Sequence, residues 1–131
     1  MKQKFYSIQG FIFQEGNILA VGIKSGASTS FNLEKAMIRA MFNSIVGPSE
    51  EENVFCGNMS DIWGDSEIKD FKINTAELSF TKYYANRPPI FYSFKKDKSN
   101  IWIGGYFGDD CGEGISKCLV SEIDESFFRS E

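Results

Sequence analysis

The segment from Ile90 to Ile123 constrains the fold most, because strand patterns and turn patterns follow one another along it. It has the sequence IFYSFKKDKSNIWIGGYFGDDCGEGISKCLVSEI. Aromatic and β-branched residues alternate there with small or charged ones, which is the period of two that a β-strand requires. The interruptions, 95–100 and 108–114, are rich in Lys, Asp, Ser, Asn and Gly, which form hairpin turns. We therefore predict antiparallel strands at about 90–95, 100–107 and 115–123.

Further strands are expected on both sides of a central acidic stretch. Residues 4–13 and 18–24 are apolar and are separated by Gln-Glu-Gly-Asn, which predicts a hairpin. Residues 71–84 predict one long or two short strands, and the prolines that follow end the pairing. Residues 48–70 indicate a long irregular loop, in which 53–56 is the best candidate for a short strand. The C-terminal residues 124–128 are compatible with a short helical turn.

One segment, from Leu33 to Val46, has the pattern of an amphipathic helix. Its apolar residues fall on one stripe at helical spacing, with charged residues largely opposite. Asn32 or Ser30 provides an N-cap, and Gly47-Pro48 provides a stop signal. We expect this helix to pack on the sheet.

These elements predict one α+β domain covering residues 1–131. A length of 131 residues with 42% hydrophobic content is enough for one core and too little for two. The expected architecture is a twisted antiparallel sheet of about six strands, in the order ββ-α-ββββ, with one helix packed on it. The alternative is a small open β-barrel closed by the helix. No motif indicates membership of a known family.

Composition narrows the classes of function. The chain has no histidine, which excludes Ser-His-Asp and Cys-His mechanisms within it. Three cysteines without a CxxC pair argue against a disulfide framework and favour a reducing cytoplasm. The net charge of −4 disfavours nucleic-acid binding. No secretory leader or membrane-spanning segment is recognisable, so we expect a cytoplasmic protein without a membrane partner.

The leading functional hypothesis is a non-catalytic binding protein that acts through protein–protein contact, as an inhibitor or regulatory subunit. Residues 48–70 contain seven acidic side chains and one lysine, and they surround a tryptophan. Such a segment would steer a basic protein partner, with the ring as its anchor. A second copy of the chain is another candidate partner. The predicted partner-binding residues are Trp63, Glu50, Glu51, Glu52, Asp61 and Asp65.

The first alternative is a small-ligand-binding protein. Strand parity places Trp102 and Tyr106 on one face, with Gly104 between them, so the two rings border a recess. Together with Tyr84 they are the candidate residues of an aromatic pocket on the sheet.

The second alternative is a carboxylate- or metal-dependent enzyme that uses Asp109, Asp110 and Glu113. These acids lie in a glycine-rich turn whose spacing differs from that of an EF-hand loop. A plain turn is therefore the favoured interpretation. The sequence identifies no catalytic residue, no metal ligand and no cofactor.

Overall fold

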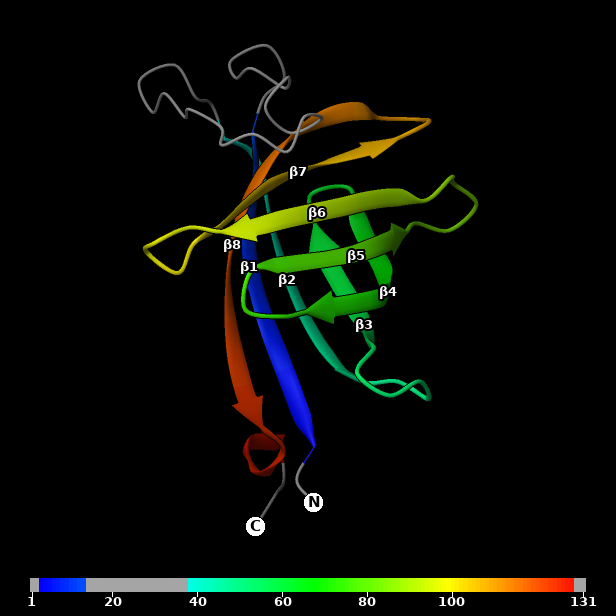
Figure 1. Ribbon diagram of the computed structural model, residues 1–131. Coiled ribbons are helices and arrows are strands. Elements are labelled where there is room, and N and C mark those ends of the chain that lie inside the picture. Colours follow the sequence, from blue (N-terminus) through cyan, green and yellow to red (C-terminus); the bar gives the residue numbers. More distant parts are fainter. Residues whose placement is uncertain (1–2, 14–37, 129–131) are drawn as a thin grey trace.

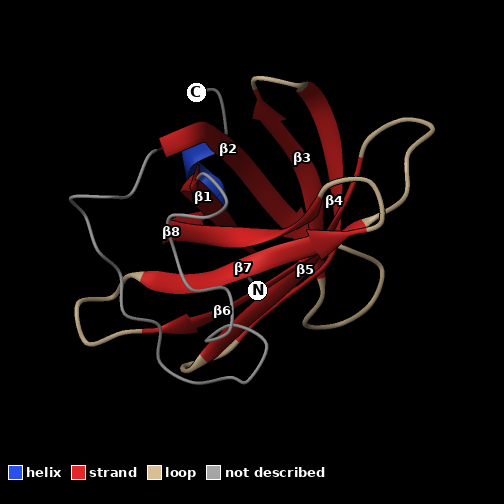
Figure 2. Ribbon diagram, turned by 90° about the horizontal axis from the view of Figure 1, so that it is seen from above, coloured by secondary structure: helices blue, strands red, loops and turns tan. Residues whose placement is uncertain are grey.

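The protein is a closed antiparallel β-barrel of eight strands (Figure 1). The computed structural model describes residues 3–13 and 38–128. Each strand pairs with its neighbours in sequence, and β1 pairs with β8 from Lys4–Asp124 to Ile12–Ser116, which closes the barrel. The view from above shows the strands arranged around an interior (Figure 2). The strands are β1 (Lys4–Phe13), β2 (Ile38–Pro48), β3 (Phe55–Asp61), β4 (Gly64–Ile73), β5 (Glu77–Tyr83), β6 (Ile90–Lys96), β7 (Trp102–Gly108) and β8 (Gly112–Asp124).

The predicted α+β fold is wrong. Within the described residues there is no α-helix, and the one helical element is a 3-10 turn, η1 (Glu125–Phe128), where the sequence predicted a short helical turn. The barrel is closed by hydrogen-bonded pairing of its first and last strands. A single sheet covered by a helix is therefore excluded, and so is an open barrel completed by one.

The predicted helix at 33–46 is contradicted where the structure describes it, because residues 38–48 form β2. From Ala40 the interior side chains alternate with exposed ones, and Phe42, Ser44 and Val46 are buried. A partly different set, Ala40, Met41, Ser44 and Ile45, satisfies helical spacing, so the apolar pattern was ambiguous. Pairing with β1 on one side and β3 on the other decides for a strand, because tertiary context overrides weak local propensity.

The other predicted strands agree with the structure in part. Strand 4–13 is β1, but its proposed partner at 18–24 lies outside the described residues, and β1 pairs with β2 and β8. Residues 71–84 contain the end of β4 and all of β5. The expected loop at 48–70 is mostly the β3–β4 hairpin, because polar outward residues hid its alternation. The last three strands correspond to β6, β7 and β8.

A column of aromatic rings lies inside the barrel. Phe71 stacks on Phe80 with ring centroids 6.1 Å apart, and Phe80 stacks on Tyr92 at 4.7 Å. Tyr92 in turn contacts Tyr106 at 5.6 Å. Rings of this size bury large apolar areas, and offset contacts between them add to the stability that burial provides. The column packs one part of the interior and ends at a cavity.

Gly10 on β1 allows one ring of this core to reach the barrel wall. A Cβ atom at this position would lie 2.1 Å from Cζ of Phe42. Only glycine permits such a close approach without moving the ring.

The connections between strands gather at two ends of the barrel. The β3–β4 turn, the β5–β6 loop and the β7–β8 turn lie at one end. The β2–β3, β4–β5 and β6–β7 connections lie at the other, together with η1 and the start of β1 (Figure 1). None of the helical structure in the described part of the chain is long and apolar enough to cross a membrane.

Candidate ligand pocket

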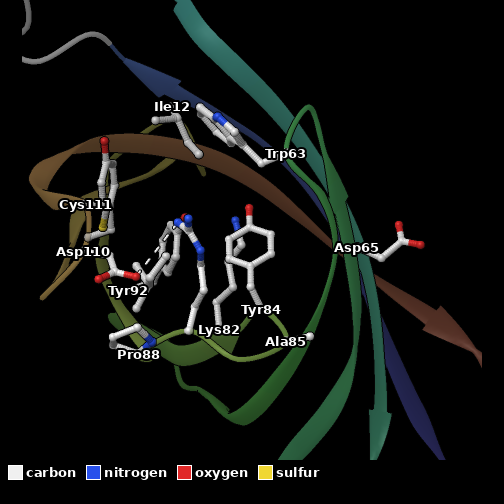
Figure 3. A pocket seen from close by; sticks show the side chains of 13 residues that line it. Ile12, Trp63, Asp65, Lys82, Tyr84, Ala85, Pro88, Tyr92, Asp110 and Cys111 are labelled. Atoms are coloured by element: carbon white, nitrogen blue, oxygen red, sulfur yellow. Dashed lines mark ion pairs between the residues drawn. The ribbon is translucent and has the colours of Figure 1, made fainter.

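A cavity of about 750 Å³ lies at the end of the barrel formed by the β3–β4, β5–β6 and β7–β8 connections (Figure 3). Side chains of these connections form its rim, and interior positions of β5, β6 and β7 form its deeper wall. Its lining combines rings, aliphatic groups and a few charges. The lining residues are Ile12, Trp63, Asp65, Lys82, Tyr84, Ala85, Arg87, Pro88, Ile90, Tyr92, Tyr106, Asp110 and Cys111.

Lys82 places a positive charge inside the barrel. It continues the inward-facing series of β5 after Leu78 and Phe80, and its side chain is only 1% exposed. Its Nζ lies 2.5 Å from Oδ2 of Asp61, the last residue of β3, whose side chain is completely buried. A buried charge is tolerated when it is paired and hydrogen-bonded. The two strands thus supply opposite charges that neutralise each other.

Asp61 also organises the groups around this pair. The hydroxyl of Tyr84 donates a hydrogen bond to Oδ2, the same oxygen that accepts from Lys82. The other oxygen, Oδ1, accepts the backbone N–H of Trp63 at 2.8 Å. One carboxylate therefore fixes the β3–β4 turn at the rim and holds two polar side chains of the pocket.

Burial changes the protonation of the polar groups in the pocket. It lowers the pKa of Lys82, and the hydrogen bond and charge of Asp61 oppose this effect without reversing it. It raises the pKa of Tyr84, as does the hydrogen bond to Asp61, since both favour the neutral phenol. Burial likewise raises the pKa of Tyr92 well above its ordinary value. Both phenols therefore remain neutral hydrogen-bonding groups at physiological pH.

Two tyrosines form an aromatic wall. Tyr92 and Tyr106 pair across β6 and β7, and both are buried. Gly114 on β8 pairs with Tyr106, and a Cβ atom there would lie 2.5 Å from its Oη. The missing side chain thus gives the Tyr106 ring room to lie against the barrel wall rather than in the cavity.

The rim carries an exposed ion pair and an aromatic ring. Nη1 of Arg87 lies 3.9 Å from Oδ2 of Asp110, and both side chains are largely exposed, so water screens this pair. Trp63 lies over the cavity near Ile12, and Asp65 points away from it (Figure 3). Among the described residues, the side chains of the rim are therefore more exposed than those of the floor.

The structure brings together two of the three residues predicted for an aromatic pocket. Tyr84 and Tyr106 line the cavity, and Trp102 does not. Trp102 begins β7 at the opposite end of the barrel, where it is buried and its ring centroid lies 5.8 Å from Nζ of Lys96. The two rings predicted to border one recess are thus in different surroundings. Trp102 belongs to the packed interior, and Tyr106 lines the cavity.

The residues predicted to bind a protein partner are divided between the two ends. The three glutamates, Glu50, Glu51 and Glu52, lie in the β2–β3 connection, far along the barrel from Trp63. Asp61 is buried against Lys82 and faces inward. Trp63 is 49% exposed, and Asp65 is exposed beside it. These six residues do not form one continuous surface.

The acidic residues predicted for a carboxylate- or metal-dependent enzyme also lie at the pocket end of the barrel. Asp109 and Asp110 are exposed in the β7–β8 turn, and Asp110 pairs with Arg87. Glu113 follows on β8 and is half-buried. No group of three or more potential metal-ligating side chains occurs in residues 3–13 and 38–128.

Sequence reasoning missed Lys82 at the pocket floor and its ion pair with Asp61. A signal was present, because Leu78, Phe80 and Lys82 share one face of the strand, and a lysine in an apolar series is unusual. Its partner Asp61 lies 21 residues earlier in the chain. Only the pairing of β3 with β4 and of β4 with β5 brings them together.

No protein-family model matches this chain, and neither does any curated protein or solved structure.

Proposed function

We propose that this protein binds a small organic molecule in the pocket at the end of its barrel. The observation that carries the proposal is a cavity of about 750 Å³ with aromatic walls and a buried Lys–Asp pair at its floor. Ligand sites in proteins typically have volumes of about 300–1,000 Å³, apolar walls and a few converging polar groups. An eight-stranded barrel is also just wide enough to hold one small ligand.

The walls favour a flat and largely apolar ligand body. Tyr92 and Tyr106 present ring surfaces, and Ile12, Ile90 and Pro88 add aliphatic contacts. Rings gain most from offset or edge-to-face contact with other rings. An aromatic or conjugated molecule of moderate size therefore suits this cavity best.

The floor favours a neutral hydrogen-bond acceptor on the ligand. Lys82 has three N–H donors, and one of them has an acceptor among the described residues, namely Asp61. The remaining donors suit a carbonyl or ether oxygen. Asp61 already balances the charge of Lys82. A ligand carboxylate would therefore gain less binding free energy here than it would beside an unpaired lysine.

We include a cytoplasmic location in this proposal. None of the cysteines in the described part of the chain forms a disulfide, which agrees with a reducing compartment.

Native mass spectrometry at low salt, on protein purified gently from its source, tests the proposal first. We expect a retained small molecule, whose mass identifies the ligand. Titration of that compound, followed by tryptophan fluorescence and thermal unfolding, then gives its affinity. The proposal fails if no small molecule is retained and a panel of flat aromatic carbonyl compounds shows no saturable binding.

A matched pair of variants locates the ligand. Tyr106→Leu removes a ring from the pocket wall, whereas Phe107→Leu removes a ring from the outer face of the same strand, where Phe107 is 58% exposed. We expect weaker binding for the first variant and unchanged binding for the second. Equal affinities would place the ligand elsewhere on the protein.

Protein–protein contact stays a prediction, now supported by one feature. The half-exposed ring of Trp63 at the rim has the character of an interface anchor. A pull-down that recovers a partner with native protein and not with Trp63→Ala would favour it over ligand binding.

A further inference from the structure

We infer that the pocket takes ligands with an aldehyde or ketone group and holds them covalently as an imine on Lys82. This inference rests on the proposed ligand-binding function and adds the chemical class of the ligand. Lysine is the side chain that forms Schiff bases with carbonyl compounds, and burial prepares it for that role because it favours the neutral amine.

The position of Lys82 sets it apart from other lysines. It lines the cavity, and its side chain is 1% exposed (Figure 3). The described lysines Lys69, Lys72, Lys95 and Lys96 are exposed. An imine in water hydrolyses readily, so a site that excludes bulk water preserves it. Lys82 therefore combines a carbonyl-reactive group with a protected position at the end of a ligand-sized space.

The neighbours of Lys82 supply the proton transfers that imine formation needs. Oδ2 of Asp61 lies 2.5 Å from Nζ, within reach for direct transfer of a proton. The Tyr84 hydroxyl donates to that same oxygen and keeps the carboxylate in place. The lowered pKa of Lys82 acts in the same direction, because burial makes the neutral amine easier to form.

The reaction balances without any further reagent. Lys82 first passes a proton to Asp61, and the neutral amine then attacks the carbonyl carbon, forming the C–N bond while the C–O π electrons move to oxygen. A proton moves from nitrogen to that oxygen and gives a carbinolamine. Asp61 returns its proton to the hydroxyl, water leaves, and a protonated imine remains beside the Asp61 carboxylate.

The site is also built to stabilise the cationic product. Asp61 remains as the counter-ion of the protonated imine. The Nζ atom lies 4.6 Å from the ring centroid of Tyr84 and 5.7 Å from that of Tyr92, both within cation–π range. The same groups that hold the ammonium thus suit the iminium that replaces it.

Reductive trapping tests the inference. The protein is incubated near neutral pH with cinnamaldehyde and sodium cyanoborohydride, and the adduct is located by intact mass and peptide mapping. We expect one adduct, of the aldehyde mass less one oxygen, on Lys82. Lys82→Arg should lose the adduct, and Lys72→Arg, which changes an exposed lysine, should keep it. Peptide mapping of the trapped protein without substitutions identifies the labelled lysine even if Lys82→Arg does not fold.

Cinnamyl alcohol separates this inference from the function on which it rests. The alcohol has the same ring and chain but forms no imine. Saturable binding of the alcohol without a Lys82 adduct from the aldehyde would overturn the covalent step and leave the ligand pocket standing. Labelling spread over exposed lysines, and undiminished in Lys82→Arg, would overturn it as well. If neither compound binds or reacts, both the imine and a pocket for such ligands are contradicted.

Discussion

Nζ of Lys82 and Oδ2 of Asp61 lie 2.5 Å apart, and the exposed fractions of the two side chains are 1% and 0%. The barrel therefore encloses a complete ion pair at the floor of its pocket. Removing two charges from water is costly, and their attraction offsets that cost only when both partners are present. This relationship makes the stability of the barrel depend on each member of the pair.

Asp61→Asn should destabilise the protein by about 3–5 kcal/mol, because it leaves Lys82 charged and unpaired in the interior. Urea unfolding followed by circular dichroism measures the change in the free energy of unfolding. The control is Asp61→Asn combined with Lys82→Met, which removes both charges and should recover most of the loss. A double variant no more stable than the single one would show that the buried charge is not the cause.

Gly114→Ala should reduce ligand affinity by moving the Tyr106 ring into the cavity. The added Cβ atom would lie 2.5 Å from Oη and 2.6 Å from Cζ of Tyr106, so the ring must shift. Overpacking of this kind costs about 1–3 kcal/mol of stability. Calorimetric titration with the identified ligand measures the affinity, and an unchanged value would mean that the ring moves elsewhere.

The two tryptophans should differ sharply in their effect on stability. Trp102 is 4% exposed, and Trp102→Ala should cost about 3–5 kcal/mol. Trp63 is 49% exposed at the rim, and Trp63→Ala should change stability by less than about 1 kcal/mol. Chemical denaturation of both variants decides this point. A large loss for Trp63→Ala would identify that ring as part of the core.

Cys118 should make the barrel less stable at alkaline pH. Burial raises the pKa of its thiol from 9.0 to about 12, so above pH 9 the unfolded chain loses a proton that the folded protein keeps. The free energy of unfolding therefore falls as pH rises from about 9 to about 12. One such group contributes a slope of about 1.4 kcal/mol per pH unit.

Cys118→Ala isolates this contribution. Its free energy of unfolding should fall less steeply between pH 9.5 and 11 than that of the unchanged protein, by about the slope of one group. Lys82 has the opposite effect on the pH dependence of stability, since its lowered pKa makes the unfolded chain bind more protons than the folded protein. This effect is present in both proteins, so it does not alter the difference between their slopes. Identical slopes would show that the Cys118 thiol does not titrate differently on folding.

The sequence by itself determined the strands with regular alternation. In β6 and β7 the inward residues Tyr92, Phe94, Trp102 and Tyr106 are aromatic and share one parity along each strand, so the period of two is visible without a structure. It also placed Tyr84 and Tyr106 in a candidate pocket. Parity along a strand is a local property, and it applies to Tyr106 in β7, whereas Tyr84 lies just beyond the end of β5.

Only the tertiary structure decided that Ile38–Pro48 is a strand and that the sheet closes. Apolar residues in this segment fit both the helical and the strand period, and pairing with β1 and β3 selects one of them. Closure depends on contacts between the two ends of the chain, such as Lys4 with Asp124. The pocket floor depends on Asp61 and Lys82, which meet through two hairpins. Such pairings join residues far apart in the chain, and the local pattern around each partner does not specify the other.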